Sequence, residues 1–537
     1  MRAILEKIFG EYDPMVFYPF VALLAFGVAA MAISPEGVLA VFNAITNFTL
    51  FKMGWFVQLL AVVVILSCFF LMASRYGDIM MGRPGDKPEF STVAWISMMF
   101  CAGFGMTMWM WCAGEIFYHM FGFDMLADQG IQGTPKSIIK GLQYVFLDNT
   151  LHGWCVYAIG AVAIALPAYR MGLPLNLAGG LYGIMGEKAY SSVWGRVVDV
   201  LGAIASVGAV ATALGMGIAI LTNGIQSILG IDVGVAGQYV ALTALTVGFL
   251  ITAVIGIERG MARMSQLNLY FSLAILAFIM IVGPSTYIGT MVSETVGEYL
   301  NSFFSLSLWG DSMNFVPVLN EAGEQIMGAS GQPVMEWKNR GYMNWWLVFY
   351  IIWWIGFIPP CGGFLARISK GRTLREFMAG AVLCPCLMVV LFFGSWSGAS
   401  SFLHFTGVVD MNQVVQNNFG GAIYAVLEQF PAAKLSMVVV FLSVLMYGIT
   451  TYDATSQYVA IQLSGGRIDT KPTMRVLVGV TMGLLGFAAV VSGRLNVLKG
   501  LTVVLGGPFV FVLLAYLYSV FKMVAKARRG EMGDGAH

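Results

Sequence analysis

The sequence has little charge. Only 11% of its 537 residues are Asp, Glu, Lys or Arg, whereas an ordinary soluble domain carries about 25%. Hydrophobic residues make up 58% of the chain. This composition excludes a soluble globular protein and predicts an integral membrane protein. The net charge of +1 gives no indication of a nucleic-acid partner.

Reactive groupings are also scarce. The seven cysteines fall in or beside apolar segments without zinc or redox spacing, so we interpret them as small packing residues. Metal-ligand spacing, a nucleophile–base arrangement and a phosphate-binding loop are all missing, and we therefore expect neither an enzyme nor an organic cofactor. The first residues, "MRAILEKIFGEYDP", are charged and amphipathic, unlike a cleavable signal peptide.

Long apolar runs are abundant. Twelve of them have roughly the 20 residues that a helix needs to cross a bilayer. They are too long for the short alternating strands of an outer-membrane barrel, so we predict an all-α protein with twelve transmembrane helices. The predicted spans are 15–34, 53–73, 92–121, 143–169, 198–229, 236–257, 265–290, 343–365, 377–400, 435–460, 473–492 and 500–521.

The positions of Lys and Arg predict the orientation of these spans. With the N-terminus inside, 21 of the 29 basic residues fall in cytoplasmic segments and 8 fall outside. Positive loops stay in the cytoplasm. An even number of spans puts both ends of the chain on the same side, so we predict that both termini are cytoplasmic.

Two further segments are too polar to span. The outside segment 291–342 begins with apolar positions at helical spacing, which predicts a helix lying along the membrane interface. The stretch 411–431 has the same character. We divide the chain into an N-terminal segment with two helices, a first repeat, an external loop, a second repeat and a cytoplasmic tail. Their residues are 1–91, 92–290, 291–342, 343–521 and 522–537.

Two spans contain helix breakers near their middle. The third has Gly103 and Gly105, and the eighth has the run "PPCGG" at 359–363. Irregular backbone at membrane depth is tolerated only where protein buries it or where it lines a cavity. Two broken helices five spans apart are typical of inverted-repeat transporters, in which they enclose the substrate. Close helix packing through small residues is the alternative reading of the glycines.

Large aromatic side chains precede the second break. Trp353 and Trp354 lie about two turns deeper than Trp345 and Trp346, which fit the usual belt of tryptophans at the membrane interface. Several aromatic faces at depth would suit a quaternary ammonium, held by cation–π attraction. The same rings could instead fill a core.

Several motifs resemble those of the betaine/choline/carnitine transporter family, in matching order and over nearly the whole chain. The most specific is "WWIGFIPPCGGFLARISKGRTLREF" at 353–377. The others are "PEFSTVAWISMMFCAGFGMTMWMWCAGEIFYHM" (88–120), "TLHGWCVYAIG" (150–160), "GMGIAIL" (215–221) and "GIERGM" (256–261).

The resemblance implies a fold and a function. The fold would be leucine-transporter-like, with two inverted five-helix repeats (spans 3–7 and 8–12) after two extra helices. The protein would be a homotrimer in the lipid of the bacterial inner membrane. It would import a methylated ammonium or sulfonium compound by sodium symport with alternating access. Glycine betaine, carnitine, choline, dimethylsulfoniopropionate and trimethylamine-like amines are the open alternatives for the substrate.

The family's aromatic box corresponds to Trp154, Tyr157, Trp353, Trp354 and Phe357. Two positions depart from the family pattern. Asn149 stands where betaine carriers often have a further tryptophan, and Phe357 replaces a tryptophan or a tyrosine. These departures favour a smaller or differently substituted cation. We place Trp109 and Met110 in the pocket wall as well.

The resemblance also implies a sodium site. Its oxygen ligands would be backbone carbonyls and hydroxyl groups, which suit a hard cation. The corresponding residues are Cys101, Phe104, Tyr447, Thr450 and Thr451. In the family's second sodium site only Ser206 offers a hydroxyl, because Val210 and Pro360 replace the other partners, so we expect that site to be weak or missing.

The way transport is energised has alternatives. Sodium-independent antiporters of the family have an arginine where this chain has Asn268, which favours sodium coupling over antiport. Some proton-coupled choline carriers of the family have an aspartate where this chain has Thr107, and this difference disfavours proton coupling. Antiport of substrate against product remains the alternative mechanism. A membrane-embedded enzyme and a channel or osmosensor are further alternatives from other classes.

A few ionisable groups lie deep in the predicted spans. They are Glu115, His119, Asp148, His152 and Asp453. Intramembrane charges are expensive and by default suggest function. Glu115, His152 and Asp453 match polar positions of the family that the sequence resembles, so structural hydrogen bonding is at least an equal explanation for them.

Overall fold

The computed structural model describes residues 2–255, 260–320, 322–328, 330–492 and 495–532. Four residues of the "GIERGM" motif, 256–259, therefore lie outside the described residues, as does Arg494 from the count of basic residues. Within the described part the chain is almost entirely helical, which confirms the all-α prediction.

The helices of the first half begin with a short amphipathic segment and end at the external loop. Their bounds are α1 Arg2–Phe9, α2 Pro14–Ile33, α3 Pro35–Asn47, α4 Gly54–Ala73, α5 Thr92–Phe104, α6 Met108–Gly122, α7 Asp124–Asp128, α8 Ile138–Asn149, α9 Leu151–Met171, α10 Tyr182–Met185, α11 Lys188–Ser191, α12 Val193–Leu229, α13 Gly234–Ile255, α14 Ala262–Val282 and α15 Ser285–Ser307.

The second half contains the other broken span and the last long helices. Their bounds are α16 Arg340–Met343, α17 Phe349–Gly356, α18 Gly363–Ile368, α19 Leu374–Met378, α20 Cys384–Phe405, α21 Met411–Asn417, α22 Ala422–Leu427, α23 Ala433–Leu463, α24 Pro472–Ser492 and α25 Leu495–Arg528. A π-helical segment, Ile358–Gly362, joins α17 to α18.

Nine helical segments among the described residues are long and apolar enough to cross a membrane, and one of them, Pro135–Met171, comprises α8 and α9. Two bent pairs raise the number to eleven if each pair is one span. The bends measure 53° between α5 and α6 and 45° between Gly341–Gly356 and Ile358–Ile368. Both lie in the two spans for which the sequence predicted a break, and prediction and structure agree there.

The remaining predicted span, 473–492, is the helix α24. Over Pro472–Phe487 it is a shorter apolar helix and is not among the nine segments counted. The multi-pass helical architecture is therefore clear, while the count of twelve rests on including α24.

Burial separates the central helices from the peripheral ones. In the most apolar window of the segment containing α8 and α9, 94% of residues are buried inside the protein, against 17% for α2. A side chain of α2 that is apolar yet uncovered is suited to lipid. The helices α9, α12 and α23 form the interior around which the two bent spans pack.

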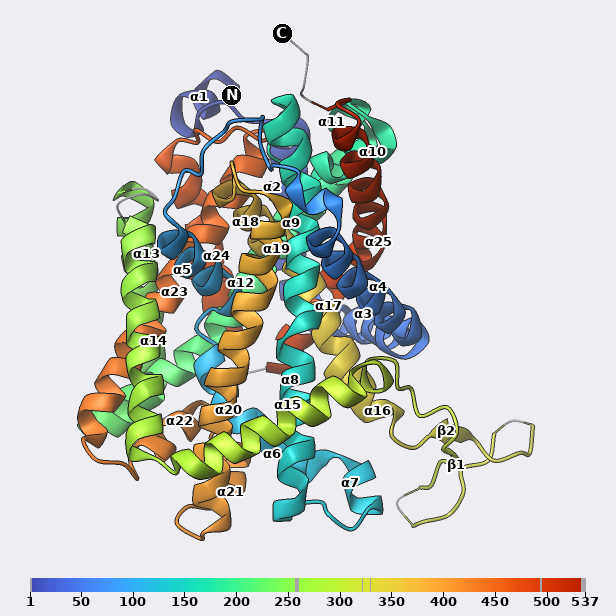
Figure 1. The fold of residues 1–537 in the computed structure, drawn as a ribbon, viewed down its shortest axis with the longest axis vertical. Helices are drawn as coiled ribbons and strands as arrows, with labels where there is room; N and C mark the ends of the chain where they lie inside the picture. The colour runs from blue at the N-terminus through green and yellow to red at the C-terminus, as the bar shows by residue number, and fades with distance from the viewer. Residues whose placement is uncertain (1, 256–259, 321, 329, 493–494, 533–537) are drawn as a thin grey trace.

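The segment predicted to lie along the interface forms a long helix. Figure 1 shows α15 running obliquely across α8 and α20, and α15 packs against both. After it comes a small hairpin that the sequence did not predict. Its strands β1 (Phe315–Pro317) and β2 (Met335–Trp337) are antiparallel, with Phe315 opposite Trp337. The stretch 411–431 forms only the short helices α21 and α22 and the turn between them.

The first helix and the end of α25 lie at the same end of the bundle (Figure 1). The β1–β2 hairpin, α7 and α21 lie at the opposite end. Both ends of the chain therefore lie on one side of the bundle, as the sequence predicted from an even number of spans.

Candidate functional site

The first break separates α5 from α6. The helix α5 ends at Phe104, Gly105 has φ 60° and ψ −174°, and α6 begins at Met108. Backbone with positive φ and extended ψ is essentially restricted to glycine, because a side chain would clash with the neighbouring peptide groups. Gly105 therefore lets the chain leave one helix and start the next at a different angle.

A third break lies in the predicted fourth span. The helix α8 ends at Asn149, Thr150 adopts φ −110° and ψ −115°, and α9 begins at Leu151. The break at Thr150 and the one at Gly105 both border the same cavity, since Asn149 and Gly105 line it.

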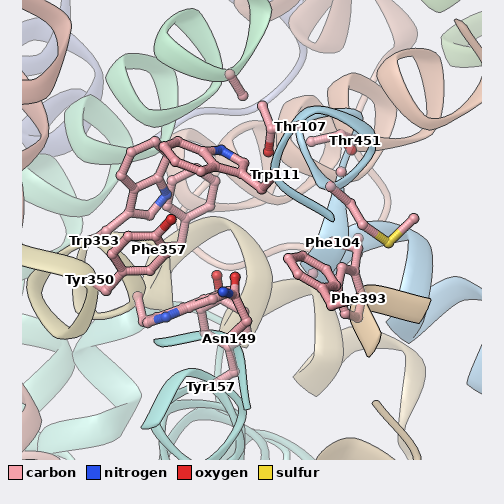
Figure 2. A pocket seen from close by; sticks show the side chains of 16 residues that line it. Phe104, Thr107, Trp111, Asn149, Tyr157, Tyr350, Trp353, Phe357, Phe393 and Thr451 are labelled. Carbon is pink, nitrogen blue, oxygen red and sulfur yellow. The ribbon is translucent and has the colours of Figure 1, made fainter. Parts of the chain in front are cut away.

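This cavity lies among the broken helices and is mainly aromatic. Its polar groups are mostly hydroxyls, and no Lys, Arg, Asp or Glu from the described part of the chain lines it. Figure 2 shows one group of rings, from Trp111, Tyr350, Trp353 and Phe357, facing the pair Phe104 and Phe393 across the space. The lining residues are Ala102, Gly103, Phe104, Gly105, Thr107, Met108, Trp111, Asn149, Tyr157, Ala213, Tyr350, Trp353, Trp354, Phe357, Phe393 and Thr451.

One wall of the cavity is a ladder of rings along the eighth span. The ring centroids of Tyr350 and Trp353 are 6.4 Å apart, those of Trp353 and Phe357 are 6.3 Å apart, and both pairs are stacked. Helical spacing of three and four residues puts these side chains on one face of the helix. The faces of this ladder are available to an electron-poor ligand.

Trp354 turns toward a second wall. Its Nε1 donates a hydrogen bond to the backbone carbonyl of Asp148 (2.8 Å), and its ring meets that of Tyr157 edge-on at 5.5 Å. A Cβ placed on Gly153 would lie 2.4 Å from Trp354 Cδ2, so only glycine lets the indole pack this closely on α9.

Five of the eight predicted substrate-binding residues line the cavity: Asn149, Tyr157, Trp353, Trp354 and Phe357. The structure brings them together from α8, α9 and the eighth span. This shared chamber is what the cation-cage hypothesis requires.

Trp154 lies one layer behind the cavity. It is fully buried, and its centroid is 5.3 Å from Phe104, 5.8 Å from Tyr157 and 6.4 Å from Trp354. All three of those neighbours line the cavity, so Trp154 supports the wall from outside.

Trp109 and Met110 are buried and do not line the cavity. The Trp109 ring packs edge-on against Phe392 at 4.9 Å and Trp396 at 6.0 Å, which joins α6 to α20. The sequence predicted both residues in the pocket wall. The residue of α6 that lines the cavity is instead their neighbour Trp111.

Sequence reasoning missed three aromatic lining residues, Trp111, Tyr350 and Phe393. Trp111 follows Thr107 by four residues and Tyr350 precedes Trp353 by three, so each lies on the same helix face as a residue already singled out. That spacing was the available signal. Phe393 of α20 carried no such signal, because its approach depends on how α20 packs against α6.

The predicted sodium ligands meet where α5 ends beside α23. Thr451 Oγ1 donates to the Cys101 carbonyl over 3.5 Å, and Thr451 also lines the cavity. Thr450 Oγ1 instead donates to carbonyls of its own helix, at 2.9 Å to Met446 and 3.1 Å to Tyr447. Phe104 is the last residue of α5, next to the break.

The other two positions considered for coupling bond elsewhere. Ser206 Oγ donates to the Gly202 carbonyl of its own helix over 2.8 Å. Asn268 of α14 accepts a 2.5 Å hydrogen bond from Ser443 of α23 through Oδ1. Asn268 therefore links two helices as a neutral group at the position where an arginine was considered.

Three ionisable side chains cluster behind Asn149. The amide Nδ2 of Asn149 donates to both carboxylate oxygens of Glu115 at 3.0 Å. His119 Nε2 lies 3.5 Å from Glu115 Oε1 and 3.7 Å from Asp148 Oδ2. All three ionisable side chains are fully buried.

The last two ionisable groups lie apart from this cluster. His152 Nδ1 is 3.0 Å from the Leu147 carbonyl, which ties the start of α9 to α8 across the break. Asp453 is buried on α23 near Arg475 of α24. The His152 contact is a structural hydrogen bond within the bundle.

Comparison with known proteins decides the family. The sequence profile described as "BCCT, betaine/carnitine/choline family transporter" matches residues 15–529. The chain belongs to this transporter family. The resemblance seen in the sequence is therefore confirmed, and the multi-pass helical bundle is that of a membrane transporter.

Individual relatives are distant but cover the chain. The glycine betaine transporter OpuD of Bacillus subtilis is 27% identical over 514 residues, which is 96% of this chain and 95% of OpuD. The osmo-dependent choline transporter BetT2 of Acinetobacter baylyi is 27% identical over 89% of this chain and 66% of its own. The high-affinity choline transport protein of Escherichia coli K12 is 26% identical over 87% of this chain and 66% of its own. Family and relatives are transporters, not enzymes, and these relatives are bacterial.

Proposed function

We propose that the protein is a secondary active transporter that imports a quaternary-ammonium or related methylated amine or sulfonium compound. The observation that supports this most directly is the aromatic cavity among three helix breaks, lined by Trp353, Trp354, Tyr157 and Phe357. The relatives named for glycine betaine and choline handle ligands of this class.

The chemistry of the cavity matches an onium head. Aromatic faces attract a cation through their quadrupoles, by up to about 2 kcal/mol per ring where water is excluded. A quaternary ammonium or a trialkylsulfonium carries its charge without N–H groups that need hydrogen-bond acceptors, so a wall of rings replaces its hydration shell better than it would for a primary ammonium.

The fold proposed for this function has twelve transmembrane helices, counting α24. Spans 3–7 and 8–12 would be two inverted five-helix repeats of leucine-transporter type, and the bent third and eighth spans would occupy corresponding places in them. Alternating access would then rock the bent helices against the remaining scaffold.

Sodium symport is the proposed energy source. Thr451 and the Cys101 carbonyl, 3.5 Å apart, offer two oxygens beside the cavity and next to the end of α5. With Phe104, Tyr447 and Thr450 they form the proposed sodium site, and Ser206 would contribute only to a weak second one. Asn268, neutral and bonded to Ser443, offers no built-in positive charge that would replace the ion.

The proposed setting is the bacterial inner membrane, with both termini in the cytoplasm and the chain assembled as a homotrimer. The count of 21 basic residues in predicted inside segments against 8 in predicted outside segments supports this orientation. The trimer follows from the family resemblance.

A ligand screen tests the substrate class. Purified protein is titrated with glycine betaine, choline, carnitine, dimethylsulfoniopropionate and trimethylammonium, with tryptophan fluorescence as the readout. We expect saturable quenching for at least one of them. The matched control is 3,3-dimethylbutanol, which has the shape of choline without the charge and is expected not to bind. Equal binding of the neutral compound would contradict the cation cage.

Uptake into proteoliposomes tests the coupling. The ligand that binds is radiolabelled and offered with and without an inward sodium gradient. We expect accumulation only with the gradient. Uptake that needs no sodium but requires substrate preloaded inside the vesicles would instead establish the antiport alternative.

A further inference from the structure

A buried acidic cluster adjoins the cavity without lining it. Glu115 and Asp148 are fully buried on α6 and α8, and His119 lies between them. Asp148 has no hydrogen-bond donor to either carboxylate oxygen among the described residues. His119 Nε2 lies 3.7 Å from Asp148 Oδ2, and one oxygen or nitrogen atom from each of the three side chains lies within 4.8 Å of the others.

The surroundings offer no permanent positive charge. Neither carboxylate forms an ion pair with Lys or Arg within the described ranges. The ionisable groups that face the cluster from the packed elements are Tyr144 of α8, Tyr299 of α15, Tyr342 of α16, Tyr350 of α17 and Cys112 of α6. All of these are neutral or anionic, so the only charge that can balance the carboxylates from within is a proton.

His119 is held so that one ring nitrogen faces the acids. Its Nδ1 is hydrogen-bonded to the Tyr342 hydroxyl, and its ring packs on Trp346 at 4.4 Å. Nε2 then points between Glu115 and Asp148. Two carboxylates this close in a low-dielectric interior cannot both ionise without a compensating cation, and they keep a proton between them or on the imidazole.

Asn149 connects the cluster to the cavity. Its Nδ2 lies 3.0 Å from both Glu115 carboxylate oxygens and 3.0 Å from the Val145 carbonyl. All three partners are acceptors, so the amide nitrogen, and not the amide oxygen, faces Glu115. The same side chain lines the cavity, as Figure 2 shows. A charge on Glu115 is thus one side chain away from a ligand in the cavity.

We propose that Glu115, His119 and Asp148 form a proton-binding site that is linked to substrate binding through Asn149. This rests on the proposed function, because it requires a positively charged ligand in the cavity. The onium group and the bound proton repel each other, so occupation of the cavity releases the proton from the cluster to the solution. By reciprocity, deprotonation of the cluster tightens substrate binding.

The sign and the limit of the effect follow from this linkage. Affinity for the onium rises as pH rises, and one linked proton changes the dissociation constant by at most about tenfold per pH unit. The effect ends at a pH at which the free protein has already lost the proton.

The experiment measures binding of choline and glycine betaine to the purified full-length protein by isothermal titration calorimetry between pH 5.5 and 8.5. Neither probe changes its own charge in this range. Titrations at one pH in two buffers of different ionisation enthalpy give the number of protons released. We expect release of a proton and tighter binding with rising pH for the wild type, a result that needs no variant to fold.

Variants then assign the proton to the cluster. Asp148→Asn and Glu115→Gln are expected to reduce the pH dependence to less than twofold over the whole range. Glu298→Gln, a half-exposed carboxylate on α15 paired with Lys140, is the matched control and is expected to keep the wild-type dependence.

Several outcomes would overturn the inference. Saturable binding with no proton release and no pH dependence would refute it while leaving the proposed function intact, as would a pH dependence unchanged in both cluster variants. Loss of the pH dependence on adding EDTA would assign the cluster to a divalent metal instead. Absence of saturable binding of either probe at every pH would refute the proposed function, and this inference with it.

Discussion

At the scale of single residues, two neighbouring threonines on α23 differ in what their hydroxyl groups reach. Thr451 Oγ1 faces the Cys101 carbonyl across the helix interface, while Thr450 Oγ1 is occupied by carbonyls of its own helix. A hydroxyl that bonds back to its helix is a poorer ligand, because binding an ion would require it to give up that contact. If the proposed sodium site is correct, removing the Thr451 hydroxyl should therefore weaken sodium binding more than removing the Thr450 hydroxyl.

We predict that Thr451→Val raises the sodium concentration for half-maximal uptake by about 3- to 10-fold, the worth of one oxygen ligand at roughly 0.5–1.5 kcal/mol. Thr450→Val is the matched neighbour and is expected to change it less. Sodium titration of substrate uptake into proteoliposomes measures both. A larger effect at Thr450, or none at either position, would place the ion elsewhere.

Trp354 combines a face in the cavity with a fixed orientation. Its ring is only 9% exposed, and its indole hydrogen bond to Asp148 fixes the ring on the side of Tyr157. We predict that Trp354→Ala weakens onium binding by about 30-fold, from the loss of one desolvated cation–π contact of about 2 kcal/mol. Fluorescence-independent binding of labelled choline and glycine betaine measures the change.

The control for this variant is Trp345→Ala in the same span. Trp345 is 42% exposed and does not line the cavity. Its removal is expected to leave affinity within about twofold of the wild type, and size-exclusion profiles confirm that both variants fold. Unchanged affinity in Trp354→Ala would remove this residue from the binding site.

At the scale of elements, the helix breaks decide where a ligand can be held. Spans three, four and eight each stop and restart at the level of the cavity, at Gly105, at Thr150 and after Gly356. A continuous helix would place side chains there and satisfy its own carbonyls, whereas a break frees backbone groups and opens space. The sequence indicated two of these breaks through glycine and proline. The break at Thr150 has no such residue at its centre.

We predict that Gly105→Ala destabilises the protein by about 1–3 kcal/mol, because alanine strongly disfavours φ 60° with ψ −174°. Substrate uptake is expected to fall together with the thermal unfolding temperature in detergent. Gly122→Ala, at the end of α6 with no atom within 4 Å of an added Cβ, is expected to change neither. Wild-type stability in Gly105→Ala would mean that the break does not depend on glycine.

At the scale of the whole molecule, orientation and span number are linked. The start of α1 and the end of α25 share one end of the bundle, and the β1–β2 hairpin lies at the other (Figure 1). In the topology predicted from the sequence, 21 of the 29 basic residues fall on the side of the termini. Because positive loops stay in the cytoplasm, this count predicts that the end of the bundle with the termini is the cytoplasmic one.

We predict that a fluorescent protein fused to the C-terminus is fluorescent in bacterial cells, whereas alkaline phosphatase inserted at Gly331 in the β1–β2 loop is enzymatically active. The first folds well only in the cytoplasm and the second only outside it. Gly331 is exposed and lies in a turn, so an insertion there is tolerated. The reciprocal fusions are the control, and the reverse pattern would invert the proposed topology.

Much of the architecture of this protein could be predicted from hydropathy and local sequence features, without any tertiary information. Span positions, the helix α15 and the breaks at Gly105 and after Gly356 follow from local features, since apolar length and helix-breaking residues act within a few turns. The motifs around Trp353 and Trp354 were enough to identify the family. Each of these signals lies in consecutive residues.

Only the tertiary structure decided which side chains share a chamber. Trp154, Trp109 and Met110 are equally plausible pocket residues by sequence, yet the rotation of each helix turns them into the interior, behind or away from the cavity. The cluster of Glu115, His119 and Asp148 likewise joins α6 to α8 across the bundle. Contacts between helices depend on axial rotation and crossing angle, which are set by packing over many residues at once, and a single stretch of sequence does not encode them.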